Sequence, residues 1–199
     1  MSTGHHRGSR RVSLVCATAV CAVGATALAG WMMGSAPTSA LVVSEISMKA
    51  NAAIALLCLG SSLMLLRSQP PGRLAGSLGR IAALVAVAIG LATLSEHLFD
   101  WDLGIDQLLF RELPGAPATA SPNRMGPPAS TCVPLLGLAL LLLDRRPSPR
   151  RTQQAQLLAG VVLLIVVVPI LGYVFGVHQL YGVARLTGIA LHTALTLGA

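Results

Sequence analysis

Acidic and histidine side chains stand at the ends of the long apolar stretches of this sequence. Glu96 and His97 close one stretch, and Asp100 and Asp102 follow shortly afterwards. The candidate cluster comprises Glu96, His97, Asp100, Asp102, His178 and His192. Ionisable groups near the ends of apolar helices can bind a ligand or carry protons. Imidazoles combined with a carboxylate can also coordinate a divalent metal ion.

Two interpretations of this cluster stay open on sequence alone. In the first, the side chains lie at a membrane surface and are satisfied by water and backbone groups. In the second, they form a functional polar cluster that binds a ligand. Nothing in the sequence shows two imidazoles facing each other, as bis-histidine haem ligation requires. We therefore predict a candidate ligand cluster with no metal ion, cofactor or catalytic residue. Glu45, Lys49 and Asn51 are ordinary helix-start residues or members of the same polar layer.

The stretch from residue 99 to residue 110 mixes aromatic and aliphatic side chains with three aspartates. It is too short to cross a bilayer, which needs about 20 apolar residues. An amphipathic segment at the outer interface fits better, with Trp101, Phe110 and Tyr181 as aromatic anchors. Either the segment is a plain cap on the helices, or it is a lid over a cavity among the third, fifth and sixth helices.

The composition indicates that most of the chain meets lipid. Of its 199 residues, 54% are apolar and only 11% are charged, whereas soluble domains carry about 25% charged residues. The mean hydropathy is +0.72. The net charge of +7 does not indicate nucleic-acid binding, because arginine clusters alternate with apolar runs and aromatic residues make up only 4%.

Six apolar stretches predict an all-α membrane protein with six transmembrane helices. The predicted spans are 12–34, 46–66, 78–98, 128–143, 155–177 and 185–199, preceded by a basic tail at 1–11. The first stretch has the basic front of a signal peptide, but it is longer than the 7–15 residues of a usual signal core. We therefore expect it to be retained as a helix.

The distribution of charge predicts the orientation of these spans. Arginines cluster before the first span, between the second and third, and between the fourth and fifth, and the intervening segments hold six of the seven acidic residues. Basic loops stay on the cytoplasmic side of a membrane. We expect a multi-pass protein of the inner or plasma membrane with both termini in the cytoplasm.

An internal repeat divides the six stretches into three helical hairpins. Met48 stands three residues before Asn51, as Met125 does before Pro128, and glycine follows each methionine after twelve residues. Ile189 stands three residues before His192 in the same way. The sixth stretch, of 15 residues from Arg185, would reach only about 22 Å. We expect this chain to be the front part of a longer protein.

Small residues at helical spacing predict where the helices touch. Ala22, Thr26 and Gly30 form one such row, and Ala82, Ala86 and Gly90 form another. Small side chains let helix backbones approach closely inside a bilayer.

Three stretches resemble the N-terminal multi-span input region of bacterial sensor histidine kinases and PAS-containing signalling proteins. They are 102–110 (DLGIDQLLF), 135–146 (LLGLALLLLDRR), and 180–183 (LYGV) with 190–195 (ALHTAL). The resemblance covers roughly residues 80–199. The fourth helix of that family usually starts with Asn-Thr-Ala, where this chain has Pro128, Ala129 and Ser130. No PAS or kinase sequence, histidine box or nucleotide-binding motif is present.

The resemblance implies a sensory input module of the membrane that is not itself an enzyme. Its expected partners are the lipid bilayer, a second copy of the chain and a cytoplasmic output domain, with no nucleic acid. The alternative is a small transporter or channel subunit, which would need polar residues at mid-membrane or broken helices at matched repeat positions. A membrane redox or hydrolytic enzyme has only the histidines in its favour.

Overall fold

The computed structural model describes residues 3–33, 47–67, 72–112, 121–143, 148–180 and 188–199. Within these ranges the chain is entirely helical, with six α-helices, one 3₁₀ turn and no strand, which confirms the predicted all-α class. The elements are α1 (Thr3–Met32), α2 (Ala50–Leu66), α3 (Arg73–Phe99), α4 (Pro127–Leu142), α5 (Pro149–Phe175), η1 (His178–Leu180) and α6 (Leu191–Gly198). α1 thus already includes most of the predicted basic tail.

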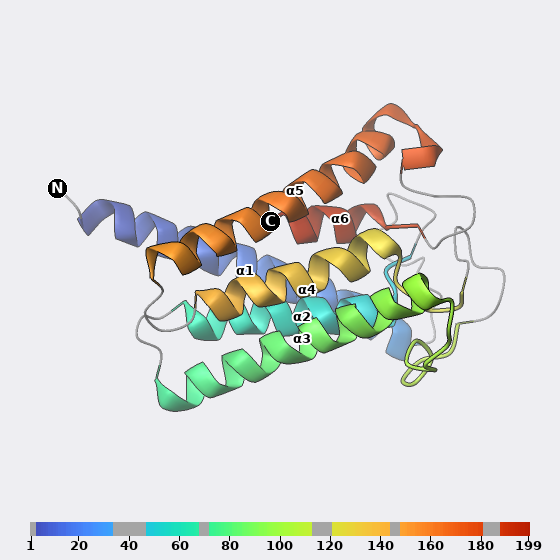
Figure 1. Ribbon diagram of the computed structural model, residues 1–199, viewed down its shortest axis with the longest axis horizontal. Helices are drawn as coiled ribbons and strands as arrows, with labels where there is room; N and C mark the ends of the chain where they lie inside the picture. The colour runs from blue at the N-terminus through green and yellow to red at the C-terminus, as the bar shows by residue number, and fades with distance from the viewer. Residues whose placement is uncertain (1–2, 34–46, 68–71, 113–120, 144–147, 181–187) are drawn as a thin grey trace.

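The six helices lie along one common axis, and successive helices run in opposite directions (Figure 1). Each helix packs against the next one in the chain, and α6 also contacts α1. α4 contacts α2 and α6 in addition. The result is a bundle with two distinct ends, one formed by the starts of α3 and α5 and the other by the starts of α2 and α4.

Three helices, rather than the six predicted, are long and apolar enough to cross a membrane. They are the segment Arg11–Met32 of α1, the whole of α3 and the whole of α5. α2 and α4 have 17 and 16 residues, and a 17-residue helix reaches only about 26 Å. α6 has eight residues, so the described helix covers about half of the predicted sixth span. Three such apolar helices indicate a membrane protein.

The long helices lie on the outside of the bundle and the short ones pack inside it. In the most apolar windows of α1, α3 and α5, only 17%, 28% and 22% of residues are buried. Large apolar side chains such as Leu84 on α3 and Leu164 on α5 are exposed. In α2, by contrast, more than half of the residues are buried. An outer surface of this kind matches lipid better than water.

The short helices begin at equivalent positions of the internal repeat. α2, α4 and α6 each begin two residues after the first residue of their repeat unit. These first residues, Met48, Met125 and Ile189, are all buried. They line one narrow cleft in which the starts of the three helices meet.

The two glycines of the repeat make equivalent contacts with the preceding helix. A Cβ added at Gly60 would lie 2.6 Å from Cys21 Sγ and 3.0 Å from the Ala17 carbonyl oxygen. A Cβ at Gly137 would lie 2.6 Å from Val87 Cγ2 and 3.1 Å from the Ala83 carbonyl oxygen. In both hairpins, glycine therefore lets two helix backbones come close.

The row of small residues predicted on the first helix does not make the α1–α2 contact. Ala22 and Thr26 are exposed on α1. The contact uses Ala17 and Cys21 instead, on another side of the helix. The prediction was wrong because small residues recur all around this helix, so their spacing alone does not select a face.

Candidate ligand site at the polar end of the bundle

Charged side chains separate to the two ends of the bundle. One end, which we name the basic end, carries Arg67, Arg73, Arg150 and Arg151 on or beside helix termini, and Arg11 within the N-terminal part of α1. The other, which we name the polar end, consists of the starts of α2 and α4, the end of α3, and the segments 100–112 and 121–126. Its described carboxylates are Glu96, Asp100, Asp102, Asp106 and Glu112, and its lysine and arginines are Lys49, Arg111 and Arg124. The polar end is therefore acidic.

Asn123 joins both loop segments of the polar end to α2. Its side chain is fully buried, and its Oδ1 accepts a hydrogen bond of 2.9 Å from the backbone N–H of Ala50 in the first turn of α2. Its Nδ2 donates to the carbonyl oxygens of Asp106, at 2.7 Å, and Phe110, at 3.1 Å. A helix start leaves backbone N–H groups without partners inside the helix. Asn123 supplies one of the missing acceptors from a distant part of the chain.

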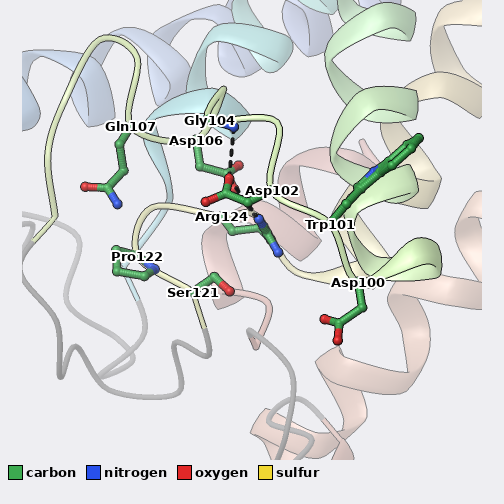
Figure 2. Close-up of a pocket in the computed structure, with 9 residues that line it drawn as sticks. All are labelled: Asp100, Trp101, Asp102, Gly104, Asp106, Gln107, Ser121, Pro122 and Arg124. Carbon is green, nitrogen blue, oxygen red and sulfur yellow. Dashed lines mark hydrogen bonds and ion pairs between the residues drawn. The ribbon is translucent and has the colours of Figure 1, made fainter.

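Three carboxylates surround the guanidinium group of Arg124. Arg124 Nε lies 2.7 Å from Asp106 Oδ2 and 3.4 Å from Glu96 Oε2, and a terminal nitrogen lies 3.5 Å from Asp102 Oδ1. Figure 2 shows Arg124 directed at Asp102 and Asp106. Asp106 also accepts a hydrogen bond of 3.0 Å from Asn51 Nδ2, which ties the cluster to α2. The Glu96, Arg124 and Asp106 side chains are all at least nine-tenths buried.

These neighbours explain the charge state of Arg124. Burial alone would lower the pKa of this guanidinium, but the hydrogen bond to Asp106 and the negative charges of Asp106, Glu96 and Asp102 raise it above its usual value. The guanidinium is therefore always charged.

A second buried ion pair lies beside the cluster. Lys49 Nζ is 2.6 Å from Glu112 Oε1, and the two side chains are only 4% and 8% exposed. The other carboxylate oxygen of Glu112 accepts a hydrogen bond from the Asn123 backbone N–H. The pair thus fixes the end of the 100–112 segment to the residue before α2 and to the 121–126 segment.

A pocket of about 290 Å³ opens between the two loop segments. It is lined by Asp100, Trp101, Asp102, Gly104, Asp106, Gln107, Ser121, Pro122 and Arg124. The predicted lid would have covered a cavity among the third, fifth and sixth helices. The lining of this pocket comes instead from the segments between α3 and α4, so the loop builds the pocket from its own residues.

The structure brings together only part of the predicted cluster. Glu96 and Asp102 share the Arg124 guanidinium, and Asp100 lines the same pocket. His97 lies beside them, but its Nε2 is 2.8 Å from the Met125 carbonyl oxygen, so it links α3 to the start of α4. No hydrogen bond or ion pair between described residues joins His192 to this cluster. The side chain of His178 lies outside the described part of the structure.

The predicted aromatic anchors occupy different surroundings. Trp101 is exposed, contacts the ring of Phe99 at a centroid distance of 5.2 Å, and donates a 3.2 Å hydrogen bond to Ser95. Phe110 is half-buried and lies 6.1 Å from Trp31 of α1. Tyr181 lies outside the described residues. Anchoring at a membrane surface stays a prediction for all three.

Sequence reasoning did not include Asp106, Asn123 and Arg124 in the candidate site, although all three are buried in it. Lys49 and Asn51, for which two interpretations were open, belong to the polar layer through Glu112 and Asp106. One signal was available for Arg124. It is a basic residue in the segment between the third and fourth predicted spans, which also holds Asp100, Asp102, Asp106 and Glu112. A basic residue among acidic ones is a better candidate for an ion pair than one in a basic loop.

Comparisons with known proteins place the chain in no group. No protein-family description, curated protein or solved structure matches it.

Proposed function

We propose that this protein is a membrane-embedded signal-input module whose stimulus acts at the polar end. In this proposal the three hairpins cross the bilayer six times, the polar end faces outward, and both termini and the basic end face the cytoplasm. The main observation in support is the buried charge cluster around Arg124, which borders a solvent-open pocket. Its contacts connect the start of α2, the end of α3 and the segment before α4.

The separation of charge supports this orientation. Arginines occupy the basic end and carboxylates predominate at the polar end, as the positive-inside rule requires for a membrane-spanning bundle. The short lengths of α2 and α4 fit the same arrangement. Asn123 of the 121–126 segment accepts a hydrogen bond from the start of α2, and the starts of α2, α4 and α6 line one narrow cleft. Protein rather than lipid can therefore satisfy the backbone N–H groups at these helix starts.

The contacts of Arg124 offer a physical route for the signal. Arg124 stands three residues before α4, Glu96 lies in the last turn of α3, and Asn51 of α2 contacts the same Asp106 carboxylate. A ligand that changed the charge around Arg124 would favour one packing of these three helices over another. A stimulus must have such differential affinity to shift a conformational equilibrium.

Spin-label distances at the basic end test this route. Labels at Leu74 of α3 and Arg150 of α5, both exposed, would be placed in a chain whose four cysteines are replaced and which is reconstituted in lipid nanodiscs. We expect Arg124→Gln at the polar end to shift the distance distribution between the labels. The matched control is Gln107→Ala, an exposed residue of the same pocket without a charge. An unchanged distribution in a folded Arg124→Gln variant would contradict the input-module function.

A further inference from the structure

The carboxylates of the Arg124 cluster have the spacing of a cation site. One oxygen from each of Glu96, Asp102 and Asp106 lies within 4.8 Å of the other two. Ca²⁺ binds oxygen at about 2.3–2.6 Å, so two of its ligands can stand up to about 5 Å apart. Mg²⁺ binds at about 2.0–2.1 Å and needs oxygens closer together. All three ligand atoms are carboxylate oxygens, which suit hard divalent cations.

A buried oxygen without a hydrogen-bond partner points to the same place. Glu96 is 1% exposed, and its Oε1 accepts a hydrogen bond of 2.9 Å from the Leu103 backbone N–H. Its Oε2 has no hydrogen-bond partner among the described residues. That oxygen lies 3.4 Å from Arg124 Nε, an ion-pair distance longer than the usual 2.7–3.2 Å of a hydrogen bond from nitrogen to oxygen. Buried carboxylate oxygens normally accept a hydrogen bond, whereas Glu96 Oε2 has only this longer ion pair.

Arg124 lies among the three carboxylates that a bound cation would neutralise. Its single positive charge faces three carboxylates, and only the contact with Asp106 has the length of a strong hydrogen bond. The pocket gives solvent access to this group through Asp102, whose side chain is 79% exposed. A divalent cation would neutralise the cluster more completely than one guanidinium does, whereas an anion would be repelled.

We propose that Glu96, Asp102 and Asp106 bind a divalent cation, Ca²⁺ in preference to Mg²⁺, in competition with Arg124. The cation enters through the pocket, coordinates one oxygen from each carboxylate and displaces the guanidinium from Glu96 and Asp102. The Arg124 link between the 121–126 segment and Glu96 of α3 is thereby broken, while the contact of His97 with the Met125 carbonyl oxygen remains. The identification of this cation as the stimulus rests on the proposed input-module function, but the binding itself does not.

Equilibrium binding of ⁴⁵Ca²⁺ to the full chain in nanodiscs of neutral lipid tests the proposal. We expect one saturable site, with Mg²⁺ as a weaker competitor. Asp102→Asn removes an exposed ligand that the fold does not need, and it should weaken binding at least about tenfold. Asp100→Asn is the matched control, since this exposed aspartate lines the same pocket but is not one of the three ligands. Its affinity should change by less than about threefold.

Arg124→Gln provides the opposite change, because removal of the competing charge should tighten Ca²⁺ binding. Arg124→Lys keeps a cation in place and should restore weaker binding. Absence of saturable binding in the folded natural chain would overturn the site, as would equal losses for Asp102→Asn and Asp100→Asn. Saturable binding that leaves the Leu74–Arg150 distance unchanged would support the cation site and show that the cation is not the stimulus. The effect of Arg124→Gln on the same distance tests the input-module function, so the two failures are distinguishable.

Discussion

The polar end and the middle of the bundle are held together by different interactions. At the polar end, buried hydrogen bonds and ion pairs connect loop segments to the starts and ends of helices. In the middle, Gly60 and Gly137 let neighbouring helix backbones approach closely, and no ion pair is found there among the described residues. Close packing in a lipid-exposed bundle tolerates few changes of shape, whereas a charge network responds to changes of charge. On this comparison we expect the middle of the bundle to respond to changes of side-chain size and the polar end to changes of side-chain charge.

The largest effect should come from leaving one charge of the polar end without its partner. Lys49→Met removes the partner of the buried Glu112 carboxylate, and we expect a loss of about 3–5 kcal/mol in the free energy of unfolding. SDS titration in mixed micelles measures this loss. The double variant Lys49→Met/Glu112→Gln should recover much of it, because the unpaired charge is gone. A Lys49→Met chain as stable as the natural one would show that the pair does not hold the polar end.

Asn123→Ala should have the next largest effect. It removes the acceptor for the Ala50 N–H and the donor for the Asp106 and Phe110 carbonyl oxygens, all at or near the polar network. We expect a loss of about 2–4 kcal/mol, because several buried backbone groups lose a partner at once. Hydrogen exchange should rise first in the initial turn of α2. Faster exchange spread evenly over all helices would mean that Asn123 is not a local connector.

Gly137→Ala tests the middle of the bundle. The new Cβ would lie 2.6 Å from Val87 Cγ2 and 3.1 Å from the Ala83 carbonyl oxygen. Overpacking of this kind costs about 1–3 kcal/mol. Gly160→Ala in α5 is the matched control, because its Cβ would meet nothing within 4 Å, and we expect it to be neutral or stabilising by up to about 1 kcal/mol. Equal destabilisation by both variants would show that Gly137 has no special role in helix packing.

Asp102→Asn should have the smallest effect on stability. The Asp102 side chain is 79% exposed and lies 3.5 Å from the Arg124 guanidinium, and exposed ion pairs contribute about 0–1 kcal/mol. Thermal unfolding should therefore change little. A large loss of stability would show that the pocket carboxylates hold the fold, and the contrast between ligand-sensitive and structural residues would fail.

The sequence allowed the helical class and much of the helix order to be predicted, because long apolar runs and their periodicity are local signals. The fourth span, for example, was predicted to start at residue 128, and α4 starts at Pro127. The true helix lengths could not be predicted in this way, because helix starts depend on distant residues. The Asn123 side chain that accepts a hydrogen bond from the Ala50 N–H is 73 residues away in the sequence. The polar site was predicted in part for the same reason. Glu96 and Asp102 are neighbours in sequence, whereas Arg124 reaches them only through the fold.

The input-module function depends most directly on the polar end and the basic end facing opposite sides of a bilayer. Gln107 at the polar end and Gln153 in α5 near the basic end are both exposed. Each would be changed to cysteine in a chain without its native cysteines and treated in intact cells with a membrane-impermeant maleimide. We predict labelling of Gln107→Cys in intact cells and of Gln153→Cys only after lysis. Labelling of both positions from the same side would contradict the orientation and the function built on it.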